Sequence, residues 1–460
     1  MENVDVLTIG AGGGAYPAAF RLARAGRRVV MVDPKGVMSG NCLAEGCVPS
    51  KAVREMAALR RQAARLGAAA GVAVAAPDYG AVVAHKDHVQ RARYGQHAEE
   101  LERAGARLRL VRGVARLRDA HTVVVESARG EVTFRAADVI LASGGEIATP
   151  SVPGTEFALS SRDLYALDPN LRDLPATLVV IGGGYIGLET ASFFQAFGCR
   201  VTILEMRERL LPGMDATFTA ELVALLDPGI ECVTGARVLR IEERGSGYGV
   251  VFEAGGAQQE RSADRVLLAA GRRPVYPEGL ADLDVRLGPA GVEVDAAMRT
   301  GVPGLWACGD VNGRVPLFHA AVRQSLVAAH NILGGEGPLD YFDFDAVPMA
   351  VFTLPGGAVV GLTRDAAAAR GIETIEASYS FAEDSRAQIL GETAGGIRLF
   401  FEAGSLRLIG GWVVGLDAEH LIGEIGLAVA GRRSAYELAA FPDQHPMAAE
   451  GICKAARGLF

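Results

Sequence analysis

The chain has 460 residues, half of them hydrophobic and 22% charged, which is typical of a globular protein with roughly two to four domains. Its formal net charge of −8 argues against nucleic acid or an anionic membrane surface as a main partner. The acidic N-terminus predicts no secretory signal, and no apolar run is long and uncharged enough for a membrane span. Most of the six cysteines are scattered singly, which favours a reducing compartment, the cytoplasm.

The first predicted strand runs directly into the glycine-rich turn GAGGGA at 10–15. A helical pattern and a second strand follow, and that strand ends in an acid. This order is typical of a dinucleotide-binding unit: the first glycine makes the turn, the second lets the backbone approach a pyrophosphate, and the acid bonds a ribose. Alanine takes the third glycine position. The residues predicted to border this dinucleotide are Gly10, Gly12, Gly14, Ala15 and Asp33.

Two cysteines, Cys42 and Cys47, stand five positions apart in the segment NCLAEGCVPSK. Gly46 permits the bend that a small, reactive disulfide between them requires. Pro49 suits a first helical turn, so Cys47 is expected near a helix N-terminus, where aligned amides favour a thiolate, and Lys51 adds to that effect. The pair is therefore predicted to be redox-active; two inert buried cysteines are the alternative.

The stretch from 51 to about 105 has the pattern of amphipathic helices broken by a turn near 77–80. On the second helical stretch His85 and His88 lie at helical spacing, with Asp87 between them. The three residues indicate either a metal site or a solvated, charged helix face. We expect the solvated face and no metal.

The dinucleotide-binding unit then recurs. A strand leads into the turn GGGYIG at 182–187, and the helix and strand that follow end at Glu205. The inner glycines, Gly26 and Gly198, each lie sixteen positions after the first glycine of their unit, and the acids each lie twenty-three after it. A repeat of this fidelity predicts two dinucleotide-binding domains in one chain. The residues predicted to border the second nucleotide are Gly182, Gly184, Tyr185, Gly187 and Glu205.

Two further strands end in glycine-containing turns, the first at Gly271 and the second just before Asp310. From about residue 341 the pattern changes to mixed strands and C-terminal helices, which predicts a separate α+β domain. Near the end, His445 precedes Glu450 at the start of a helix. This arrangement suits a general base held by a carboxylate, although a surface histidine–glutamate pair is the simpler interpretation.

Taken together, these motifs resemble the flavin-dependent pyridine nucleotide–disulfide oxidoreductases, and among them the dihydrolipoamide dehydrogenases. The resemblance covers nearly the whole chain: both glycine turns, the Cys42–Cys47 pair with its Pro-Ser-Lys, the strand before Asp310, and His445-Pro446 with Glu450 come in the family's order. It implies an α/β fold with two Rossmann-like domains and a C-terminal α+β dimerisation domain. The implied segments are an FAD-binding part over 1–147, an NAD-binding domain over 148–272, a central FAD-binding part over 273–342 and a dimerisation domain over 343–460.

The resemblance also implies the cofactors. FAD would lie on the first glycine turn, with Asp310 at its ribityl and pyrophosphate region, and the nicotinamide nucleotide on the second. Glu205 favours NAD, because a carboxylate bonds a ribose hydroxyl but repels a 2′-phosphate, while Arg207 and Arg209 leave some room for NADP. Glu189 matches the position that pairs with the active-site lysine. The other cofactor positions implied by the family pattern are Lys51, Gly144, Gly271 and His319.

The family mechanism implies an obligate homodimer in which the C-terminal domain delivers its histidine to the partner's site. His445, polarised by Glu450, would take a proton from a dihydrolipoyl group on a separate lipoylated carrier protein. The resulting thiolate would attack Cys42, and Cys47 would pass electrons to FAD and then to NAD.

Several residues depart from the family pattern, among them Gly356 and Gly357, where the family usually has an acid. Glu45 replaces an apolar residue and would oppose a thiolate if it lay close; Met447 replaces a threonine; Asp443 stands where a histidine is common. Glutathione reductases carry lysine where Ser50 stands, and mercuric reductases have a paired-cysteine tail where only Cys453 occurs here. These enzymes, and a redox-sensing FAD/NAD module without turnover, remain the alternatives.

Overall fold

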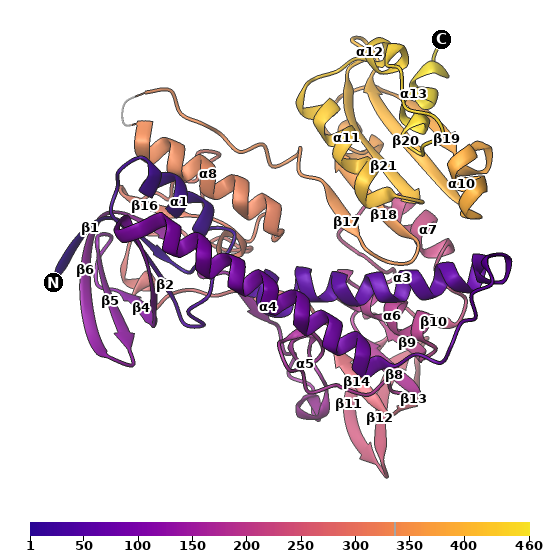
Figure 1. Ribbon diagram of the computed structural model, residues 1–460, viewed down its shortest axis with the longest axis horizontal. Coiled ribbons are helices and arrows are strands. Elements are labelled where there is room, and N and C mark those ends of the chain that lie inside the picture. Colours follow the sequence, from indigo (N-terminus) through magenta and orange to yellow (C-terminus); the bar gives the residue numbers. More distant parts are fainter. Residues whose placement is uncertain (335–336) are drawn as a thin grey trace.

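The first strand, β1 (Glu2–Ile9), lies inside a seven-stranded sheet of the computed structural model, which describes residues 1–334 and 337–460 (Figure 1). The strand order is β3-β2-β1-β6-β5-β4, and β16 also pairs with β6. Strands β1, β2, β3, β6 and β16 run parallel, whereas β4 and β5 add to the sheet in antiparallel pairings. Their buried, valine-rich runs are typical of a sheet covered on both faces. The other strands of this sheet are β2 (Val29–Asp33), β3 (Leu108–Arg112), β4 (Val114–Leu117), β5 (Thr122–Ser127), β6 (Gly130–Leu141) and β16 (Leu305–Ala307).

Two helices pack together beside this sheet, α1 (Tyr16–Arg24) and α8 (Phe318–Gly334). Helix α1 starts directly after the first glycine turn and buries its alanine and leucine face. The turn is thereby held between the end of a central strand and the start of a helix, as the sequence predicted.

Three helices extend from this domain between β2 and β3: α2 (Gly40–Glu45), α3 (Cys47–Ala70) and α4 (Tyr79–Ala104). Only Gly46 separates α2 from α3. The long helices are separated as predicted, but the break spans 71–78, earlier than the turn predicted near 77–80. Helix α4 begins where Asp78 accepts a hydrogen bond from the Ala81 amide (3.0 Å). The long helices reach across to the second domain (Figure 1).

The second domain contains a four-stranded parallel sheet in the order β10-β9-β8-β14, with an antiparallel sheet of β11, β12 and β13. Strands β7 (Gly145–Ile147) and β15 (Arg272–Pro274) pair antiparallel where the chain leaves the first domain and returns to it. The remaining elements are α5 (Ser161–Tyr165), β8 (Thr177–Ile181), α6 (Tyr185–Phe197), β9 (Arg200–Leu204), α7 (Ala216–Ala224), β10 (Ile230–Val233), β11 (Arg237–Arg244), β12 (Gly247–Ala254), β13 (Ala257–Ala263) and β14 (Arg265–Leu268).

The C-terminal domain is built on a five-stranded antiparallel sheet, β17-β18-β21-β20-β19. Glu221 on α7 joins it to the second domain by accepting hydrogen bonds from Arg398 (2.8 Å) and Trp412 (3.0 Å). The elements of the C-terminal domain are β17 (Met349–Val351), β18 (Gly356–Gly361), α9 (Arg364–Ala368), β19 (Thr374–Ser380), α10 (Ser385–Leu390), β20 (Gly395–Glu402), β21 (Leu408–Gly415), α11 (Ala418–Ala430), α12 (Ala435–Ala440) and α13 (Glu450–Arg457). Across the described ranges, no helix is both long and apolar enough to cross a bilayer.

Candidate active site

The two glycine turns have the same backbone geometry. Gly10 and Gly182 both have φ of +111°, a conformation that favours glycine. A Cβ on Gly10 would lie 2.1 Å from the carbonyl oxygen of Ala142, and one on Gly182 would lie 2.4 Å from that of Ala269. Each turn therefore needs a glycine both for its backbone conformation and for its close approach to the end of the neighbouring parallel strand, β6 or β14.

The acid that ends each unit is buried and bonds to its own glycine turn. Asp33 accepts from the amides of Ala11 (3.2 Å) and Lys35 (2.8 Å). Glu205 accepts from the matching amides of Gly183 (2.6 Å) and Arg207 (2.7 Å). The internal repeat thus extends from residue spacing to hydrogen bonding, and each acid fixes the turn beside which a ribose would lie.

Helix α6 starts without a side-chain cap, so its first amides remain available to an anion such as a pyrophosphate. Helix α1 also lacks a side-chain cap, but its Tyr16 amide donates to the Gly12 carbonyl (3.0 Å) and Pro17 has no amide hydrogen. A Cβ on Gly144, Gly184 or Gly271 would meet no protein atom within 4 Å. Backbone open in this way suits a bound ligand. The predicted nucleotide positions therefore fit two dinucleotides.

The third glycine position differs between the two turns. A Cβ on Gly187 would lie 2.0 Å from the Gly182 carbonyl oxygen, whereas Ala15 is accommodated and fully buried in the first turn. Gly14, one position earlier, approaches the Cys308 carbonyl oxygen, from which an added Cβ would lie 2.5 Å away. The tightest helix contact thus falls at different positions in the two units.

The remaining predicted cofactor positions have distinct surroundings. Burial raises the pKa of Asp310, which lies beside Gly145, and nearby Arg272 opposes that rise. His319 donates from Nε2 to the Pro348 carbonyl (2.7 Å), and the Tyr185 hydroxyl lies 3.9 Å from the Met349 sulfur. His319 and Tyr185 therefore each connect a nucleotide-binding domain to the segment that begins the C-terminal domain.

The two cysteines flank the break between α2 and α3. Cys42 lies within α2, and Cys47, reduced like its neighbour, is the first residue of α3. A Cβ on Gly46 would lie 2.9 Å from the Asn41 carbonyl oxygen, so the predicted bend is confirmed as a close backbone approach. A hydrogen bond between the thiols raises the pKa of Cys42 and lowers that of Cys47. Desolvation by the surrounding protein atoms opposes the lower pKa of Cys47, although the residue is exposed, and the positive charge of Lys51 favours the lower pKa.

Lys51 lies one turn along α3, where three domains meet. Its Nζ is 2.7 Å from Glu189 Oε2 on α6 and 4.2 Å from the centroid of the Phe352 ring. Glu189 also accepts from the Phe352 amide (3.0 Å). The predicted Lys51–Glu189 pair is thus present, and it fixes α3 against both other domains.

Glu45 does not act on the thiols as its position suggested. Its side chain is 3% exposed and lies among three cations: Arg162 (2.8 Å), Lys35 (3.5 Å) and Arg272 (3.7 Å). Burial alone would raise the pKa of Glu45, but these cations lower it overall. The Glu45 carboxylate therefore stays ionised, and its negative charge is balanced by cations that lie far from it in the sequence.

His445 and Glu450 are paired as predicted, with Nδ1 of the histidine 2.9 Å from Oε1 of the glutamate. Burial would raise the pKa of Glu450, but hydrogen bonds from His445, the Met447 amide and Lys454 lower it. Met447 contributes only its backbone to this pair, so the threonine of related sequences is not needed for it. Helices α12 and α13, which flank His445, lie far from the start of α3 in the same chain (Figure 1).

The predicted solvated face on α4 is only partly correct. His85 and His88 are exposed, but Lys86 and Asp87 between them are buried. Within 1–334 and 337–460 there is no cluster of three or more side chains able to hold a metal ion. Sequence periodicity did not single out Lys86.

Comparison with known proteins shows the family to which this chain belongs. Residues 4–325 match the family model described as pyridine nucleotide-disulphide oxidoreductase, and residues 347–456 match the dimerisation domain of the same family. The chain belongs to this family. The dihydrolipoyl dehydrogenases of Geobacillus stearothermophilus and Bacillus subtilis are 35% and 33% identical to it, and each alignment covers 99% of this chain and 96% of the relative.

Solved structures of two further proteins share the fold. LpdA from Mycobacterium tuberculosis superposes with a TM-score of 0.89 at 24% identity, covering 100% of both chains. The Cu(II) complex of the HOCl-induced flavoprotein disulfide reductase RclA from Escherichia coli gives 0.86 at 24% identity, also covering 100% of both. As a pyridine nucleotide-disulphide oxidoreductase, this chain is an enzyme that acts on sulfur groups with FAD and NAD(H) as cofactors. The expected α/β fold and family are thereby confirmed.

Proposed function

We propose that this protein is a dihydrolipoyl dehydrogenase, which oxidises dihydrolipoyl groups on a separate lipoylated carrier protein and reduces NAD. The observation that carries the proposal is the dithiol itself. Cys47, with its lowered pKa, starts a helix and lies near the Lys51–Glu189 pair. A thiol with these neighbours is suited to leave as a thiolate during disulfide exchange.

The first glycine turn, with Asp33, would hold the adenosine and pyrophosphate parts of FAD, and Asp310 would accept from its ribityl hydroxyls. The second turn, with Glu205, would hold NAD. FAD, when bound, supplies two-electron transfer between the dithiol and the nicotinamide. We set the domain boundaries after residues 147, 272 and 342; the pairing of β7 with β15 supports the first two.

Side chains of this protein carry out the proton transfer and the thiol–disulfide exchange. His445 takes a proton from one substrate thiol, while Glu450 holds the imidazole through Nδ1. The substrate thiolate attacks the Cys42 sulfur of the oxidised pair, and Cys47 leaves as a thiolate stabilised by Lys51 and the start of α3. The second substrate thiol then displaces Cys42, which releases the cyclic disulfide and leaves both protein cysteines reduced.

This chemistry requires two copies of the chain. His445 stands between α12 and α13 in the chain, and these helices lie far from the start of α3 (Figure 1). We infer from this that His445 does not reach Cys42 of its own chain. The dimerisation domain over 347–456 supports a homodimer in which each site combines the dithiol of one copy with the histidine of the other.

The decisive experiment measures NADH formation by the purified FAD-loaded protein with free dihydrolipoamide, with NADP in parallel. NADH formation that is lost in Cys47→Ser supports the proposal. A flavin-loaded, disulfide-competent dimer without turnover overturns it. Mercuric ion and glutathione disulfide, each with NADH or NADPH, are then the substrates to assay.

A further inference from the structure

The short helix that carries Cys42 is capped by a side chain from α4. Gln90 donates from Nε2 to the carbonyl oxygens of Leu43 (2.9 Å) and Ala44 (3.2 Å), the two residues that follow Cys42. The last four carbonyls of any helix have no partner within the helix. In α2, which has six residues, Gln90 satisfies two of them.

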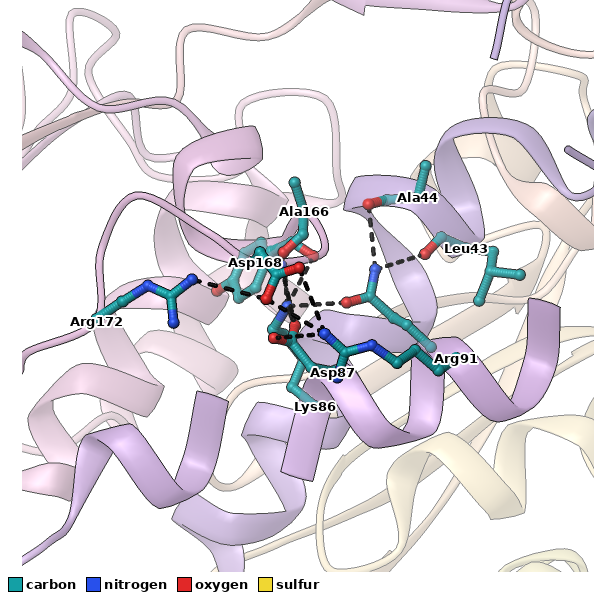
Figure 2. A network of polar contacts seen from close by, with 10 residues as sticks. Leu43, Ala44, Lys86, Asp87, Arg91, Ala166, Asp168 and Arg172 are labelled. Carbon is teal, nitrogen blue, oxygen red and sulfur yellow. Dashed lines mark hydrogen bonds and ion pairs between the residues drawn. The ribbon is translucent and has the colours of Figure 1, made fainter. Parts of the chain in front are cut away.

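Lys86 lies one turn before Gln90 on α4 and is completely buried. Its ammonium donates to Gln90 Oε1 (2.8 Å) and to the Ala166 carbonyl (2.6 Å), and it pairs with Asp87. Figure 2 shows Lys86 and Asp87 gathered beneath Ala166 and Asp168, with Leu43 and Ala44 on the other side. Ala166 is the residue after α5, so one lysine–glutamine pair joins the ends of two short helices from different domains.

A second contact joins the same two helices. Glu45, the last residue of α2, accepts from Arg162 on α5 (2.8 Å). Helix α2 is therefore held to α5 at its carbonyl end through Gln90 and Lys86, and at its last side chain through Glu45. A helix of six residues is too short to hold its own shape in water, so these contacts fix it.

We propose that Gln90 and Lys86 are positioning residues that hold Cys42 where its sulfur can meet that of Cys47. Neither side chain reaches the reacting sulfurs; both act through the backbone of α2. The proposal rests on the proposed exchange role of the two cysteines but not on the identity of the substrate.

Positioning of this kind has a thermodynamic signature. Two thiols held in place close a disulfide more readily than two that must first be ordered, which raises their effective concentration. The equilibrium is Cys42–Cys47 disulfide plus two glutathione thiols giving the protein dithiol plus glutathione disulfide. Loss of positioning shifts it toward the dithiol.

The test titrates the FAD-loaded protein in glutathione buffers of known ratio and counts alkylated Cys42 and Cys47 by mass spectrometry. Gln90→Met keeps the side-chain length but removes the amide. We expect the equilibrium to shift about tenfold toward the dithiol, which for a two-electron couple is roughly 30 mV. If Gln90→Met does not fold, Gln90→Glu decides, because it keeps the side-chain shape and the contact with Lys86 but turns the carbonyl-facing donor into a carboxylate oxygen.

The matched control is Asn331→Leu. Asn331, on α8, is another buried amide, and it donates to the carbonyls of Ala297 (3.1 Å) and Asp340 (3.0 Å). Arg91→Ala is a second control at the exposed edge of the same cluster, because Arg91 lies on α4 and pairs with Asp168 (3.2 Å) and Asp87 (3.9 Å) without touching Gln90. Both should stay within twofold of the unmodified protein. A Gln90 variant that also stays within twofold, or an equal shift in Asn331→Leu, overturns the proposal. Because the titration uses no dihydrolipoamide, the measured glutathione equilibrium can be interpreted even if the protein does not oxidise dihydrolipoyl groups.

Discussion

Lys51 Nζ lies 2.7 Å from Glu189 Oε2, which ties the helix that begins at Cys47 to the helix that begins beside the second glycine turn. The two charges act on the Cys47 thiol in opposite directions. Lys51 lowers its pKa and Glu189 raises it. One ion pair therefore both joins two domains and sets the reactivity of a sulfur.

We predict that Lys51→Met and Glu189→Gln change Cys47 reactivity in opposite senses. Loss of Lys51 raises the Cys47 pKa, so less thiolate is present at pH 7 and alkylation of Cys47 slows by roughly tenfold. Loss of the Glu189 charge lowers the pKa and speeds alkylation. Iodoacetamide rates against pH, read on the Cys47 peptide, measure both. Changes in the same direction would show that the pair acts only through structure.

The separation of His445 from its own dithiol predicts complementation between inactive chains. Cys47→Ser and His445→Gln homodimers should each be inactive. After subunits are exchanged in equal amounts, half of the dimers are mixed and each has one intact site, so about a quarter of full activity returns. NADH formation with dihydrolipoamide measures this. A mixture that stays inactive would place both residues in one chain's site.

The cations around Glu45 predict a pH-dependent contribution to stability. Because the folded-state pKa of Glu45 is lowered, its contribution is present above the unfolded pKa and is lost as pH falls through the folded value. Glu45→Gln should lower the free energy of unfolding by about 1–2 kcal/mol at pH 7, since Arg162 is largely exposed and can be solvated. Urea unfolding at pH 7 and in acid checks this, because the difference between the two proteins should shrink in acid. A constant difference would contradict the argument.

Cofactor selectivity should depend on Glu205 and not on the arginines after it. Arg209 donates to the carbonyls of Leu211, Pro212 and Met214, so its guanidinium is committed to its own loop. We expect Glu205→Ser to raise the KM for NAD by about tenfold without efficient use of NADP, because one charged hydrogen bond to the ribose is lost. Steady-state kinetics with both nucleotides measure this. A preference for NADP in Glu205→Ser would show that Arg207 suffices to bind the phosphate.

Much of the site could be predicted from sequence because it depends on local patterns. The turn at Gly10, the repeat at Gly182 and the bend at Gly46 each follow from a few neighbouring residues, and the structure has all three. The short helix α2 before the bend was not predicted. The repeat even predicted the positions of Asp33 and Glu205, although not that each acid bonds to its own turn.

The rest depends on contacts between distant segments. Glu45 looked unfavourable beside two thiols, because the cations that neutralise it come from position 35, from α5 and from β15. Lys86 lies between two exposed histidines, where helical periodicity gives no sign of burial. Its partners are the adjacent Asp87, the Gln90 amide one turn away and the carbonyl of Ala166, the residue after α5. A backbone carbonyl has no signature in sequence.

The pairing of β16 with β6 has a consequence for how this protein is made. Both strands belong to the first sheet, yet the entire second domain is encoded between them. On the ribosome, the second half of β6 stays an open edge until synthesis has passed residue 307, while Cys42 and Cys47 have long since emerged. The two thiols are therefore synthesised and exposed well before the first sheet can be completed, so the sheet and the redox pair become native at different stages of synthesis.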